Sequence, residues 1–145
     1  MVEHMTWLLS LAVSLALTDI GPPPPTPDLF FRAFANAIAR QAWPMVAAHV
    51  RPGSKFPIGI EGTDRHERKT YTYEDVLAGK VPFPVCDDHY RCGTTSPTGK
   101  VGCYCRRGKD VAVFQFIVDD SPEPPSPLLL VSIQEKLGAW KPESP

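Results

Sequence analysis

Residues 110–119, DVAVFQFIVD, decide the fold class of this chain. In an extended conformation Phe114 and Phe116 alternate with Val113 and Ile117, so both faces of the segment are apolar. A strand with two apolar faces lies inside a protein and is covered on both sides. We therefore predict a sheet that packs against a helix on one face and lines a pocket or a partner surface with the other.

Further strand patterns lie on both sides of this segment. Residues 100–106 precede it across a tight turn, and residues 128–136 follow it after a Pro-rich loop. Together with the central segment they predict a three-stranded antiparallel meander. Two earlier strands are predicted at residues 56–60 and 70–72, and Pro57 favours a sheet edge for the first of them.

Helical patterns come before and between these strands. Thr26 is suited to cap a helix over residues 27–41, whose apolar residues follow three- and four-residue spacing. A second, short helix is predicted over residues 44–50. A third follows Thr72, because Thr72 and Asp75 fit a capping box. Helices followed by an antiparallel sheet predict an α+β fold, with the N-terminal helices packed on the sheet.

The length of 145 residues suits one domain. Hydrophobic residues make up 43% and charged residues 21%, which is near ordinary globular usage. Five of the 17 prolines lie between residues 22 and 27, where they predict an extended linker. We therefore predict a Pro-rich linker at residues 17–27 and a single domain at residues 28–141.

The N-terminal segment points to export. Residues 7–17 carry no charge and are mostly apolar, but a membrane span needs about 20 apolar residues, so no stable membrane anchor is predicted. Their length suits a signal peptide, and Ser14-Leu15-Ala16 offers a cleavage site after Ala16. The absence of Lys or Arg before the run favours the alternative, a buried helix or strand. We predict a signal peptide at residues 1–16 and a secreted or periplasmic protein.

Charge and motifs exclude several function classes. Without residues 1–16 the chain has 15 basic and 15 acidic residues, and such a balance does not favour a nucleic-acid partner. The sequence contains no G-x-S-x-G, no H-E-x-x-H and no phosphate-cradling glycine loop. We predict no cofactor.

Four cysteines lie close together, at Cys86, Cys92, Cys103 and Cys105. In an exported chain such a cluster predicts two disulfides, whereas in the cytosol it would favour a metal site. Cys103 and Cys105 share a face of one predicted strand, so we expect each to pair with Cys86 or Cys92, in either order. The bridges would tie a loop at residues 82–105 to the sheet. A zinc site is the rival, although the spacing fits it poorly.

Acid–base groups occur mainly in polar segments. A carboxylate, a tyrosine and a histidine that converge in an apolar cavity can transfer protons. The candidates, most of which lie in loops or at the ends of elements, are Asp64, His66, His49, Tyr71, Tyr73, Asp119, Asp87, Asp88 and His89. Their positions favour structural or solvated roles, so we predict no catalytic residue.

Three short stretches, together with the predicted order of elements, carry a resemblance to a known family. They are residues 30–38 (FFRAFANAI), residues 71–77 (YTYEDVL) and the closing Gly138-Ala139-Trp140. This pattern resembles the cone-shaped fold of the NTF2-like superfamily, to which ketosteroid isomerase and SnoaL-type polyketide cyclases belong. A cystatin-like domain, one helix wrapped by a meander, is the alternative. The Cys-rich insertion departs from the family pattern.

The resemblance implies a curved antiparallel sheet with a pocket between sheet and helices, and frequent homodimers. Side chains expected in the pocket or at its rim are Phe34, Tyr71, Tyr73, Phe83, Tyr90, Phe114 and Phe116. We predict a non-catalytic binding domain for a small apolar ligand or a protein partner, with a homodimer possible. The alternatives are an isomerase- or cyclase-type enzyme and a secreted, disulfide-stabilised structural or inhibitory module.

Overall fold

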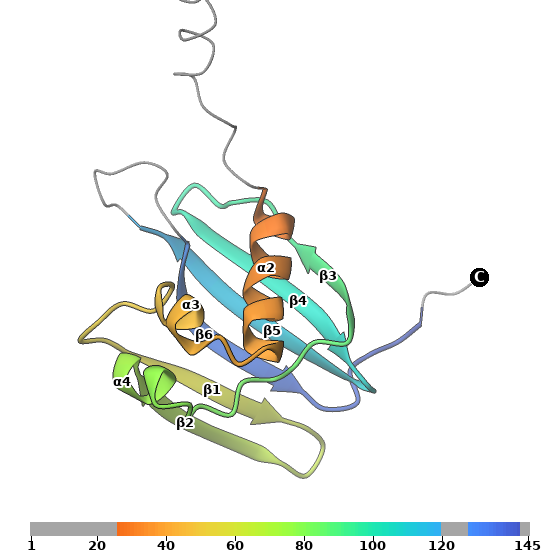
Figure 1. The fold of residues 1–145 in the computed structure, drawn as a ribbon. Helices are drawn as coiled ribbons and strands as arrows, with labels where there is room; N and C mark the ends of the chain where they lie inside the picture. Colours follow the sequence, from red (N-terminus) through yellow and green to blue (C-terminus); the bar gives the residue numbers. More distant parts are fainter. Residues whose placement is uncertain (1–25, 120–127, 143–145) are drawn as a thin grey trace, which may run out of the picture.

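The computed structural model describes residues 26–119 and 128–142. The predicted signal peptide, and all but the last two residues of the predicted linker, lie outside these ranges. Helices and a single sheet form the described part, which is an α+β fold as predicted (Figure 1). In chain order the elements are α2 (Pro27–Ala39), α3 (Trp43–Ala47), β1 (Lys55–Glu61), β2 (His66–Thr72), α4 (Tyr73–Leu77), β3 (Asp88–Cys92), β4 (Lys100–Arg107), β5 (Asp110–Val118) and β6 (Leu128–Lys136).

The sheet has six strands in the order β2-β1-β6-β5-β4-β3. The predicted meander is confirmed, because β4, β5 and β6 are consecutive antiparallel neighbours. The prediction of a wholly antiparallel sheet is wrong, since β1 runs parallel to β6. The segment from α4 to β3 carries the chain past β1 to the far edge, and the meander then returns strand by strand until β6 lies beside β1.

The strand β1 lies inside the sheet, between β2 and β6, so the predicted edge position is wrong. Pairing with β6 begins at Ile58, opposite Ile133, one residue after the proline. Pro57 therefore lies beyond the ladder on that side, and its missing N–H removes no bond there. The true edges are β2 and β3.

The helix α2 packs over strands β3, β4 and β5. The Thr26 hydroxyl accepts a hydrogen bond from the Leu29 N–H at 3.3 Å, which confirms the predicted start. The ring of Phe31 lies 5.1 Å from that of Phe114, and the ring of Phe34 lies 5.4 Å from that of Phe116. These buried rings fill the space between helix and sheet.

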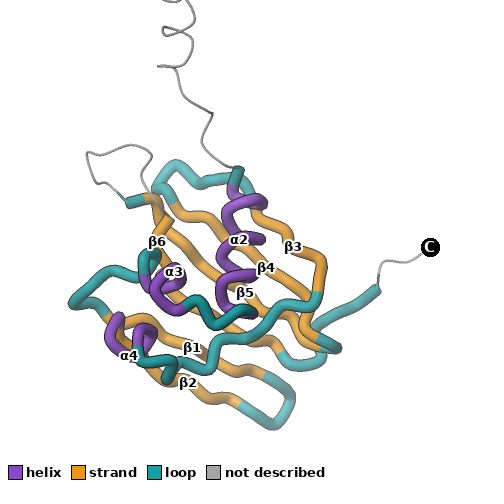
Figure 2. The backbone as a smooth tube through the Cα atoms, in the orientation of Figure 1, coloured by secondary structure: helices purple, strands orange, loops and turns teal. Residues whose placement is uncertain are grey.

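The three helices among the described residues, α2, α3 and α4, lie on one face of the sheet (Figure 1). The predicted third helix is α4, and both hydrogen bonds of its capping box are present between Thr72 and Asp75. The predicted second helix is shorter than residues 44–50, because regular structure in α3 stops at Ala47. Figure 2 shows the connection from α4 to β3 crossing the helix side of the sheet as a loop.

Candidate functional site

A hollow of about 600 Å³ opens on the helix-bearing face, beside the area that α2 covers. We call it the β1–β2 pocket. Its lining comes from β1, the β1–β2 turn, β2, β4, β6 and the loop after α4. It comprises Ile58, Ile60, Arg65, Glu67, Arg68, Lys69, Tyr71, Pro82, Phe83, Arg107 and Glu135. No residue of α2 takes part.

The sheet register puts apolar and charged side chains side by side in this pocket. Ile58 of β1 is opposite Lys69 of β2, and Ile60 is opposite Glu67. Directly opposed residues on antiparallel strands point to the same face. The floor therefore alternates between branched aliphatic groups from β1 and charged groups from β2.

Two ion pairs cross the pocket lining. Arg65 contacts Glu67 at 2.9 Å, and Arg107 contacts Glu135 at 2.8 Å. The hydrogen bond to Glu67 raises the pKa of the Arg65 guanidinium above its ordinary value. The Glu135 side chain is only 13% exposed, so Arg107 holds a nearly buried carboxylate. The Arg107–Glu135 pair therefore holds its carboxylate in place, whereas both partners of the Arg65–Glu67 pair are more than half exposed.

One wall of the pocket is an aromatic stack. The Phe83 ring lies between Trp43 at 5.9 Å and Phe56 at 6.1 Å, with the planes nearly parallel. Phe56 in turn lies 6.2 Å from Tyr71, whose ring reaches the pocket. Offset stacking of this kind adds to the burial of each ring. The wall is held by helix α3, strand β1 and strand β2 together.

Two disulfides tie the loop after α4, and the strand that follows it, to β4. Cys86 bonds to Cys105, and Cys92 bonds to Cys103. This confirms the prediction that each of the later cysteines pairs with one of the earlier two, and it selects one of the two possible orders. All four sulfurs are engaged in these bonds, so the zinc alternative for this cluster is excluded in the described structure.

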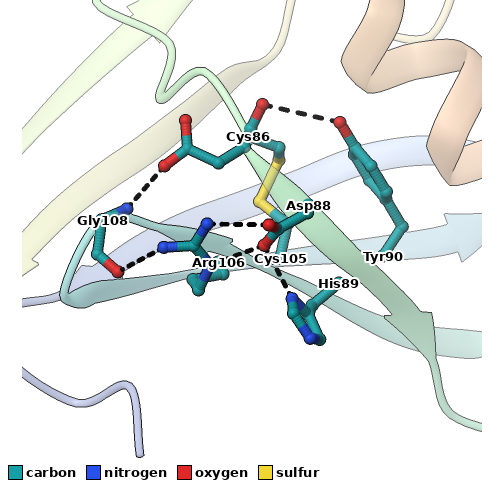
Figure 3. Close-up of polar contacts among 8 residues, drawn as sticks. Cys86, Asp88, His89, Tyr90, Cys105, Arg106 and Gly108 are labelled. Atoms are coloured by element: carbon teal, nitrogen blue, oxygen red, sulfur yellow. Dashed lines mark hydrogen bonds and ion pairs between the residues drawn. A yellow bond between two sulfur atoms is a disulfide. The ribbon is translucent and has the colours of Figure 1, made fainter. Parts of the chain in front are cut away.

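A polar cluster lies beside the first disulfide (Figure 3). Arg106 donates two hydrogen bonds to the Asp88 carboxylate, at 2.6 and 2.7 Å, and Nδ1 of His89 lies 2.7 Å from the same carboxylate. Hydrogen bonds from Arg106, and then from His89, hold the pKa of Asp88 well below its ordinary value of 3.8. The carboxylate is thus a fixed anion that bridges two strands.

The cluster also fastens the end of the loop to the β4–β5 turn. The Asp87 N–H donates to the Arg106 carbonyl at 2.8 Å, and the Gly108 N–H donates to the Asp87 carboxylate at 2.7 Å. Arg107, which lines the pocket, lies between these two contacts in the chain. The cluster is therefore a frame for the pocket rather than part of its lining.

The seven predicted pocket residues take three different places. Tyr71 and Phe83 line the β1–β2 pocket. Phe34, Phe114 and Phe116 belong to the filled core under α2. Tyr73 and Tyr90 pack against the outside of that core, and Tyr90 also borders a separate groove beside α2.

The predicted acid–base candidates do not converge on one cavity. Asp87, Asp88 and His89 form the frame described above. His49 packs edge-on against Phe30, and its Nδ1 lies 3.2 Å from the Leu128 carbonyl. Tyr71 alone of these candidates lines the β1–β2 pocket. Tyr73 is the first residue of α4, His66 starts β2 and Asp64 lies in the turn before it. Asp119 is 3.8 Å from Arg51.

Sequence reasoning missed the charged residues of the pocket. Glu67 and Lys69 lie between the strands predicted at residues 56–60 and 70–72, and Arg107 lies just after the strand predicted at residues 100–106. For Glu67 and Lys69, the sequence feature that could have predicted the strand is the alternation of residues 66–72, in which every second residue faces the same side. This alternation could not be recognised, because both faces of this edge strand are largely polar and no apolar residue marks one of them.

Comparisons of the chain with protein families, with curated proteins and with solved structures found no match. Within the described residues, no helix has the length and apolar character that a membrane span requires. Two disulfides are typical of proteins in oxidising compartments. A function is therefore inferred from the pocket itself.

Proposed function

We propose that this chain is a binding domain that holds a small, largely apolar ligand in the β1–β2 pocket. The observation that carries the proposal is the pocket's construction. Its volume of about 600 Å³ suits a small molecule, since ligand sites commonly measure roughly 300–1,000 Å³. A packed aromatic wall and a floor that alternates between aliphatic and charged groups offer a ligand both apolar contact and hydrogen-bond partners.

We further propose an NTF2-like fold and export from the cytosol. The element order supports the first: two helices, two strands, a third helix and four strands, with the helices on one face. The two disulfides and the apolar run at residues 7–17 support the second.

Binding is favoured over proton-transfer catalysis. The space under α2 is filled by phenylalanine rings, which leaves no enclosed cavity there for a catalytic base. Both carboxylates of the open pocket, Glu67 and Glu135, are held by arginines. A contact surface centred on Phe83 is not favoured either, since Phe83 is only 7% exposed.

The neutral fluorophore N-phenyl-1-naphthylamine tests the proposal. We expect saturable binding to the disulfide-bonded protein, and loss of binding in Ile60→Trp, which fills the pocket from its floor. Glu67→Trp fills the same pocket from the exposed edge strand, where the fold depends less on the side chain. Val131→Trp is the matched control, because Val131 is 45% exposed and does not line the pocket.

Circular dichroism accompanies each titration, so that only folded variants are compared. The proposal is overturned if the wild-type protein does not bind the fluorophore, or if both pocket-filling variants bind it as well as the wild type does.

A further inference from the structure

We propose that the ligand of the β1–β2 pocket is an amphipathic anion, with its acidic group at Lys69 and its apolar body on the aliphatic floor. This inference rests on the proposed function and names the chemical class of its ligand. It follows from how the charges of the lining are paired.

The lining carries more positive than negative groups. Arg65, Arg68, Lys69 and Arg107 border the pocket, against Glu67 and Glu135. The two carboxylates are already bound by Arg65 and Arg107. A cationic ligand would share each carboxylate with an arginine and be repelled by its guanidinium, whereas an anionic ligand would not.

Among the described residues, two cations of the lining, Arg68 and Lys69, take part in no ion pair. Arg68 lies opposite Gly59 and points to the other face of β2, so Lys69 is the available cation on the pocket floor. Among the described residues no carboxylate lies within ion-pair distance of its ammonium, which is 5.7 Å from the centre of the Tyr71 ring. A lysine ammonium has three hydrogen-bond donors, and a contact with a ring face leaves donors free for an acceptor. An anion at this point would form charge-assisted hydrogen bonds.

The surroundings of Lys69 explain why the anion should be amphipathic. Lys69 lies opposite Ile58 in the β1–β2 register, and the Tyr71 ring beneath its ammonium continues the aromatic wall through Phe56 to Phe83. An inorganic anion would leave this apolar surface unused. A molecule with an apolar body and one acidic group would contact both the apolar surface and the Lys69 ammonium.

A matched pair of fluorophores tests the inference. 8-Anilinonaphthalene-1-sulfonate and N-phenyl-1-naphthylamine share an aromatic skeleton, and only the first carries an anionic group. We expect wild-type protein to bind the sulfonate about five- to tenfold more tightly in low salt, with the preference shrinking as salt is added. Lys69→Met should remove the preference, measured as the ratio of the two affinities, and Lys69→Arg should retain it.

Lys100→Met is the control, because Lys100 starts the strand whose far end, Arg107, lines the pocket. Equal affinities of wild-type protein for the two fluorophores would overturn the inference, as would a Lys69→Met variant that retains the preference. In either case the proposed function stands if Ile60→Trp still abolishes binding of the neutral compound. If neither Ile60→Trp nor Glu67→Trp changes the binding affinity of either fluorophore, both the proposed function and the inference are overturned.

Discussion

Gly79 shows how a single residue shapes the wall of the pocket. It follows α4 with φ +69°, and a Cβ at this position would lie 2.9 Å from Nε1 of Trp43, the ring that stacks on Phe83. Gly108 has a similar φ of +62°, but nothing lies within 4 Å of a Cβ placed there. The two glycines therefore share a backbone requirement and differ in the space around them.

We predict that Gly79→Ala lowers the free energy of unfolding by about 2–4 kcal/mol, from the left-handed backbone and the steric contact together. Gly108→Ala should lower it by only about 1–2 kcal/mol, since the backbone alone is strained. Urea unfolding of both variants measures the difference. Equal losses would mean that the Trp43 ring moves aside freely and does not fix the wall.

His49 makes the stability of the fold depend on pH. Its ring is partly buried against Phe30, and this burial lowers its pKa below 6.5, an effect that the hydrogen bond to the Leu128 carbonyl offsets in part. The unfolded chain then takes up a proton at a higher pH than the folded chain does. The contribution of His49 to stability is therefore complete above about pH 6.5 and decreases as the pH falls through 6.5 toward the folded pKa.

We predict that wild-type protein loses more stability between pH 7.5 and pH 5 than His49→Asn does. The asparagine amide can still donate to the Leu128 carbonyl but does not titrate. Asp75 and Asp88 stay ionised across this range, because their pKa values lie below 3.8. Urea unfolding at the two pH values gives the comparison, and parallel losses in both proteins would contradict the prediction.

At the scale of an element, α4 depends on its cap. The helix has five residues, and the Thr72 hydroxyl accepts from the Asp75 N–H at 3.2 Å while the Asp75 carboxylate accepts from the Thr72 N–H at 2.9 Å. We predict that Thr72→Ala lowers the free energy of unfolding by about 1 kcal/mol. Thr72→Ser should retain most of the stability that the cap contributes, because the serine hydroxyl can accept the same hydrogen bond. Chemical denaturation is the measurement. A serine variant as unstable as the alanine variant would assign the effect to the methyl group instead.

Elements with a local signal were predictable from the sequence, and others were not. Three local patterns each predicted the correct element, because each depends on residues close together in the chain. They are the cap at Thr26, the capping box at Thr72 and the apolar alternation of residues 110–118. The strand β3 was predicted as loop, because its five residues are mostly polar and its pairing with β4 is interrupted by an irregularity. Its Cys92 is disulfide-bonded to Cys103 of β4, a partner that lies outside any local window.

At the scale of the whole molecule, the pocket combines segments far apart in the chain. Phe34, Phe114 and Phe116 were predicted to line the pocket, but they lie in the filled core under α2. An aromatic side chain in the sequence does not by itself distinguish a filled core from a pocket wall. The distinction comes from pairing: β6 beside β1 brings Glu135 to the floor, and the β4–β5 turn brings Arg107 to Glu135. Such a pairing between distant strands leaves no pattern in either strand alone.

The two disulfides have different relations to this pocket. Cys86–Cys105 fastens the end of the loop that carries Pro82 and Phe83, whereas Cys92 and Cys103 are already opposed in the β3–β4 ladder. Their sequence separations are 19 and 11, so loop-closure entropy predicts stabilising effects that differ by only about 0.5 kcal/mol. Similar losses of stability should therefore accompany different effects on binding.

We predict that removing either disulfide by a double alanine substitution lowers the free energy of unfolding by about 2–4 kcal/mol. Only Cys86→Ala with Cys105→Ala should also weaken binding of N-phenyl-1-naphthylamine, because the wall formed by Phe83 then loses its covalent anchor and must be ordered when the ligand binds. Urea unfolding measures the first effect, and fluorophore titration of the folded variants measures the second. Equal affinities in the two double variants would mean that the Asp88–Arg106 pair and the backbone contacts of Asp87 hold the wall without the disulfide.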